Sequence, residues 1–135
     1  MGGLGALMYT LKHPEDVESI LVISPFLGYP GIIHEIENAG GVRKWKPGNY
    51  DPEDDWQRML WDSLKQIAAG QKSMPVEIYL GYGTEDYFAP AHKLLADLLP
   101  RDHVIITAGG HTREAMRWIW LSFLEKKLIK TVILN

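Results

Sequence analysis

The sequence contains no cysteine, no long run of charge of one sign and no apolar run long enough to cross a membrane. The absence of cysteine excludes disulfides, thiolate catalysis and Cys-based zinc sites, and it leaves the redox compartment open. The 14 basic and 17 acidic residues give a formal net charge of -3, so the positive field that binds a nucleic-acid backbone is missing. We therefore expect neither nucleic acid nor a membrane span, and a cytoplasmic location by default.

The composition and the amino-terminal segment fit one globular domain over residues 1–135. A hydrophobic content of 46% lies in the ordinary range for folded domains. The apolar segment Met1 to Leu11 lacks the basic leader of a signal peptide and ends in Lys12-His13-Pro14, so we do not interpret it as a targeting segment.

Short apolar runs alternate with helical patterns along most of the chain. The alternation predicts an α/β fold in which three parallel strands are flanked by helices. The expected strands are Ile20 to Ser24, Val76 to Tyr82 and His103 to Ala108, and the expected helices are Gly2 to Leu11, Pro90 to Leu99 and Arg113 to Lys127.

Residues 25–70 have a different character, because glycines and prolines recur there between short helical stretches. This change predicts a helical cap or lid inserted into the domain. Its clearest helix runs from Pro52 to Ala68, with Pro52 in the first turn and with Trp56, Leu60 and Leu64 at helical spacing.

Three segments at strand-to-helix junctions carry residues suited to chemistry. They begin with the glycine-rich start Met1-Gly2-Gly3, followed by Gly83-Thr84-Glu85-Asp86 and then Gly109-Gly110-His111. A carboxylate at a strand end can orient an imidazole, and a histidine on a nearby loop can act as base and then as acid. Each has a structural alternative: a flexible terminus, a turn or helix cap for Asp86, and an ordinary loop histidine for His111.

The other histidines are read as ordinary loop histidines, because none follows a predicted strand on a glycine loop. They are His13, His34, His92 and His103. His34 and Glu35 are adjacent but lack the further ligands that a metal site requires, so we expect no metal and no cofactor.

The order of the three segments resembles the α/β-hydrolase superfamily, and in particular serine esterases of the esterase D and enterochelin esterase type. Met1, Gly2 and Gly3 resemble the end of the Ser-Met-Gly-Gly form of the nucleophile elbow, and Asp86 and His111 resemble the acid and the histidine of the catalytic triad. The resemblance implies a partial α/β-hydrolase fold, an acyl-enzyme mechanism, a small acyl-ester substrate, and an oxyanion-hole N–H at Met1.

No serine of this chain stands where the resemblance requires the nucleophile. Ser24 is followed by Pro25 instead of an elbow, and Ser73 has no strand before it. We therefore expect the carboxy-terminal portion of a serine carboxylic-ester hydrolase, truncated just after its serine and inactive alone. Its incomplete sheet favours self-association or pairing with a missing amino-terminal half.

The alternative hypothesis is a non-catalytic scaffold or interaction module. In that interpretation the hydrolase-like half supports the insert, and three tryptophans of the insert contact a partner. These are Trp45, Trp56 and Trp61.

Overall fold

The computed structural model describes residues 1–134, with side chains described through residue 129. Helices and strands follow one another in the order expected for an α/β fold. The elements are α1 (Gly2–Lys12), the 3-10 turn η1 (Pro14–Asp16), β1 (Ser19–Ile23), α2 (Pro30–Asn38), α3 (Trp56–Ala68), β2 (Glu77–Gly83), α4 (Ala89–Ala96), the 3-10 turn η2 (Arg101–His103), β3 (Val104–Thr107) and α5 (Arg113–Leu134).

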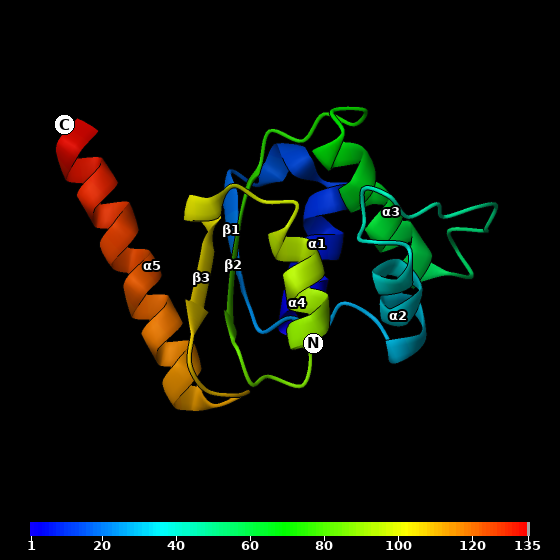
Figure 1. Ribbon diagram of the computed structural model, residues 1–135. Helices are drawn as coiled ribbons and strands as arrows, with labels where there is room; N and C mark the ends of the chain where they lie inside the picture. Colours follow the sequence, from blue (N-terminus) through cyan, green and yellow to red (C-terminus); the bar gives the residue numbers. More distant parts are fainter. Residues whose placement is uncertain (135) are drawn as a thin grey trace.

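The three strands form one parallel sheet in the order β1-β2-β3, which confirms the predicted architecture. The sheet lies between two layers of helices: α1 and α4 pack on one face and α5 packs on the other (Figure 1). Val22 of β1 is in register with Leu80 of β2, and Leu80 is in register with Val104 of β3. Within the described residues, the outer edge of β1 has no strand partner. The fold is therefore a partial α/β fold with β1 at one edge and β3 at the other.

The central strand is apolar on both faces because helices cover both of them. Residues 78–83 of β2 are all buried, and Leu80 is fully excluded from solvent. A Cβ added at Gly81 would collide with the side chain of Ile119, so α5 lies close against the strand at this glycine. Glycine in the strand thus sets the spacing between the sheet and α5.

Several helix boundaries differ from those predicted; α4, for example, ends at Ala96 and not at Leu99. Helix α3 begins at Trp56 and not at Pro52, because the Asp55 side chain accepts a hydrogen bond from the Arg58 amide and caps the helix there. Residues 51–54 instead form a turn closed by Asp54 N–H to Asp51 carbonyl. Helix α5 continues past Lys127 to Leu134, so residues 128–134 extend the helix.

Residues 25–70 share a hydrophobic core with the rest of the chain. Leu27, Ile36 and Leu60 are fully buried in the same cluster as Leu80. A cap or lid function for this segment stays a prediction. Its helices are, however, joined to the sheet layer by apolar packing.

Two of the three tryptophans of this segment are buried in the core, whereas Trp56 is partly buried against it. Trp61 is fully buried and its indole N–H donates to the Leu27 carbonyl at 2.8 Å. Trp45 is 1% exposed and donates to the Glu35 carboxylate at 2.8 Å. Buried indoles with satisfied N–H groups are typical of structural tryptophans, so these two side chains cannot contact a partner in this structure.

Among residues 1–134, none of the helices combines the length and the apolar character that crossing a bilayer requires.

Candidate active site

Asp86 and His111 meet at the edge of the sheet where β2 and β3 end. Nδ1 of His111 and Oδ2 of Asp86 are 2.9 Å apart. A carboxylate only accepts hydrogen bonds, so Nδ1 carries the proton and donates it, which leaves the Nε2 lone pair available on the neutral ring. The Asp86 side chain is fully buried, whereas 38% of the His111 side chain is exposed. The pair therefore presents one basic nitrogen to solvent while the carboxylate fixes the ring from behind.

Backbone contacts hold the two loops together. The Glu85 amide donates to the Gly109 carbonyl at 3.0 Å, and the Thr84 amide donates to the Thr107 carbonyl at 2.9 Å. A Cβ added at Gly83 would collide with the Gly109 carbonyl, so the loops can approach this closely only if position 83 is glycine. Gly109 has a φ of +104°, a conformation that other residues adopt only with strain. The glycines of both segments thus fix the separation between acid and histidine.

The Asp86 carboxylate accepts three hydrogen bonds. The Phe88 amide donates to Oδ1 at 2.9 Å, His111 donates to Oδ2, and the Ser24 hydroxyl is the third donor. Burial alone would raise the pKa of Asp86, but these hydrogen bonds outweigh it, and the pKa lies below its usual value. Asp86 is therefore ionised at neutral pH and able to hold the imidazole.

Ser24 belongs to this arrangement, although the sequence analysis did not assign it a role. It directly follows β1, is 6% exposed, and has a φ of +48°. Its amide donates to the Gly81 carbonyl at 2.8 Å, which continues the ladder between β1 and β2 by one residue. Its position at the end of a strand is the signal that could have identified it, because parallel strands end at the same edge of a sheet.

His92 supports the segment that carries Ser24. It lies inside α4 and is fully buried, so the interpretation as an ordinary loop histidine is wrong for this residue. Nε2–H donates to the Pro25 carbonyl at 2.8 Å, and within the described part of the chain Nδ1 has no hydrogen-bond partner. Burial lowers the pKa of His92, so the ring is neutral and acts as a structural donor.

The predicted elbow residues Met1, Gly2 and Gly3 lie at the start of α1. Met1 is the N-cap residue and is 86% exposed. A Cβ added at Gly3 would lie 2.8 Å from the Pro25 Cβ, so α1 begins in close contact with the residue next to Ser24. Figure 1 shows the amino terminus at the end of the sheet where the strands finish. Their role at an oxyanion hole stays a prediction.

Two cavities differ in their relation to the Asp86–His111 pair. One of about 690 Å³ lies between the carboxyl end of α1 and α3, and neither Asp86 nor His111 lines it. The other, of about 480 Å³, is lined by Phe88, whose ring centroid is 6.1 Å from that of His111. Because of this contact, the smaller cavity lies next to the Asp86–His111 pair.

A cluster of metal-ligating groups occurs at the end of α1, away from the pair. His13, Glu15 and Asp16 offer ligand atoms within 4.8 Å of one another, but both carboxylates are exposed and Asp16 accepts a hydrogen bond from the Tyr9 hydroxyl. Exposed groups of this kind commonly occur without an ion.

Comparison with known proteins identifies the family. The chain matches the family model described as "Putative esterase" over residues 1–127. No curated protein and no solved structure matches the chain. The match covers α1, the whole sheet, both loops of the Asp86–His111 pair and most of α5. The chain therefore belongs to this esterase family.

Proposed function

We propose that the intact protein hydrolyses carboxylic esters through an acyl-enzyme, with His111 as general base and Asp86 as the residue that orients it. The observation that carries this proposal is the 2.9 Å hydrogen bond between a fully buried carboxylate and a partly exposed imidazole. In acyl transfer the histidine takes the proton of a nucleophilic hydroxyl and later returns it to the leaving alcohol, while the carboxylate stabilises the imidazolium.

We further propose that the nucleophilic serine precedes Met1 in the intact polypeptide, on a strand that pairs with β1. The outer edge of β1 has no strand partner within the described residues, and α1 packs on β1. A strand placed at that edge and leading into α1 would end close to Pro25 and Ser24, at the same edge of the sheet as His111. The serine of the triad would then meet Nε2 from this side.

Ser24 is unsuited to be that nucleophile. Its side chain is buried, and its hydroxyl is hydrogen-bonded to Asp86, not to Nε2 of His111. A nucleophile needs an accessible hydroxyl within reach of the base. Ser24 instead stabilises the carboxylate.

The proposal is tested by labelling the intact protein with a fluorophosphonate probe and locating the modified residue by mass spectrometry. The expected result is one modified serine, at the last position before Met1, with labelling abolished by His111→Ala. The matched control is His13→Ala, which removes a partly exposed histidine at the end of α1, outside both the Asp86–His111 pair and the cavity lined by Phe88, and should label normally. Absence of labelling, or labelling that persists in His111→Ala, would contradict the proposal.

A further inference from the structure

The cavity beside His111 is aromatic and carries no formal charge. It lies between the segment that joins β1 to α2 and the loop that joins β2 to α4. Its volume of about 480 Å³ is in the range of small-molecule sites. The lining includes Phe26, Tyr29, Ile33, Tyr87 and Phe88, and none of its residues is Asp, Glu, Lys or Arg. Binding a carboxylate there would require its desolvation without a lysine or arginine of the lining to compensate.

Phe88 connects this cavity to the Asp86–His111 pair. Its ring stands nearly perpendicular to the His111 ring, at an interplanar angle of 88°. Its amide donates to Asp86, so the hydrogen bond that holds the carboxylate also fixes the position of Phe88. The Phe88 ring would therefore separate a group bound in the cavity from the His111 imidazole.

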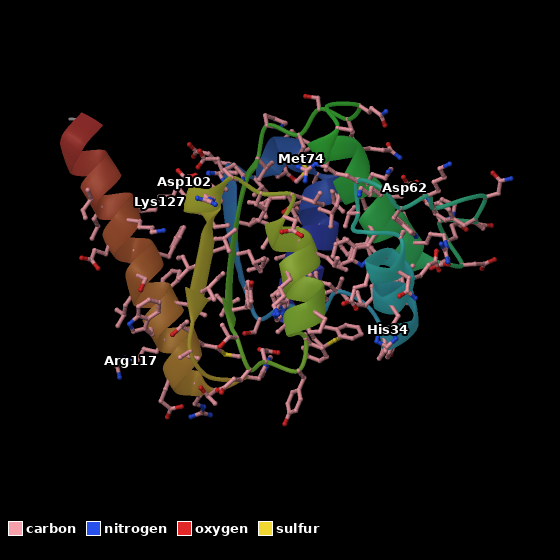
Figure 2. All side chains as sticks on the ribbon, in the orientation of Figure 1. His34, Asp62, Met74, Asp102, Arg117 and Lys127 are labelled. Carbon is pink, nitrogen blue, oxygen red and sulfur yellow. The ribbon has the colours of Figure 1, made fainter. Side chains whose placement is uncertain are left out.

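The aromatic side chains are arranged edge to face, as aromatic rings prefer. Phe26 makes such contacts with both Phe88 and Tyr29, at centroid separations of 5.4 and 5.2 Å. Tyr29 and Tyr87 are 62% and 86% exposed, so they form the opening of the cavity. His34 lies on α2 (Figure 2) and also lines the cavity. A planar ring that enters between the tyrosines can make further edge-to-face contacts with Phe26 and Phe88.

We propose that this cavity binds a neutral aromatic ring carried by the ester substrate, on one side of the bond that is cleaved. The inference rests on the proposed function for its place in catalysis. The ring binding itself depends only on the cavity. Edge-to-face contacts favour a phenyl ring over a cyclohexyl ring of similar size by roughly 2- to 10-fold in affinity. The uncharged lining disfavours a ring that bears a carboxylate.

The binding test uses the intact protein and requires no turnover. N-methylphenylacetamide, N-methylcyclohexylacetamide and 4-carboxyphenylacetic acid N-methylamide are titrated in turn and followed by NMR. The expected result is that the phenyl amide shifts signals of Phe26, Ile33 and Phe88 and binds more tightly than the other two probes. Equal or tighter binding of the cyclohexyl or carboxylate probe would overturn the inference, as would shifts confined to the cavity between α1 and α3.

Variants of the opening test the location. Tyr29→Ala and Tyr87→Ala each remove an exposed side chain, so both proteins should fold and bind the phenyl amide severalfold more weakly. Trp118→Ala removes a half-exposed aromatic side chain of α5 and should leave binding unchanged. Unchanged binding in both tyrosine variants would overturn the inference.

The esterase activity of the intact protein separates this inference from the proposed function. Normal phenyl binding without hydrolysis of any ester would refute the function alone. Hydrolysis with no preference for phenyl over cyclohexyl esters would refute the aromatic cavity alone.

Discussion

Replacing Asp86 by Asn tests whether the negative charge of the buried carboxylate stabilises the fold through its hydrogen bonds. The substitution keeps the shape of the side chain, so it creates no cavity, but it leaves one acceptor oxygen for three donors: Phe88 N–H, the Ser24 hydroxyl and His111 Nδ1–H. A hydrogen bond to a charged group contributes about 1.5–3 kcal/mol, and rotation of the Ser24 hydroxyl recovers part of the loss. We expect Asp86→Asn to lower the free energy of unfolding by about 2–3 kcal/mol at pH 7.

The effect of Asp86→Asn on the free energy of unfolding should depend on pH. The pKa of Asp86 in the folded protein lies below the ordinary value of 3.8, so the carboxylate stabilises the fold above that pH and its contribution is lost as pH falls through the folded pKa. The difference between wild type and Asp86→Asn should therefore shrink as pH falls below about 4.

Urea unfolding at pH 7 and pH 3 measures this difference, with Asp54→Asn as a control that changes an exposed carboxylate and should cost less than about 0.5 kcal/mol. Equal stability of Asp86→Asn and wild type at pH 7, or a difference as large at pH 3, would refute the reasoning.

Three further predictions concern the surroundings of the pair. Ser24→Ala removes a donor to the carboxylate, so the pKa of Asp86 should rise toward its ordinary value in a carboxyl NMR titration, and an unchanged pKa would contradict the assigned hydrogen bond. Gly3→Ala places a Cβ against Pro25 and should lower the unfolding free energy by about 1–3 kcal/mol. Gly5→Ala has open space around it and should raise the unfolding free energy by about 0.5–1 kcal/mol. Thermal unfolding measures both variants, and equal effects would argue against the close packing of α1. Hydrogen bonds from Arg58 lower the pKa of Glu35 to about 2. The contribution of the Glu35 carboxylate to stability should therefore persist above pH 4.5 and disappear as pH falls toward 2. Glu35→Gln should make the unfolding free energy less dependent on pH in this range.

The fold was predictable where local pattern and tertiary context agree. The three strands were predicted within one or two residues, because apolar runs bounded by glycine or proline match a sheet covered on both faces. The start of α3 was predicted wrongly, since Pro52 and Asp55 are both good helix-start residues and only the folded structure shows which of them caps the helix.

The site was predictable only in part, for a physical reason. Asp86 and His111 lie on glycine loops at strand ends, and topology brings such loops to one edge of the sheet. Ser24 contacts Asp86, which lies 62 positions further along the chain, and His92 reaches Pro25 from the interior of a helix. The position of Ser24 at a strand end was the available signal, whereas the contact of His92 leaves no local pattern in the sequence. The aromatic cavity likewise depends on how α2 and α4 pack together.

The most direct test of the central claim is the rate of ester hydrolysis by the intact protein, with and without the His111 imidazole. A short neutral ester should be hydrolysed, and His111→Ala should lower kcat/KM by roughly 1,000-fold or more in protein that remains folded. Hydrolysis by His111→Ala at the wild-type rate would show that the Asp86–His111 pair does not perform the chemistry.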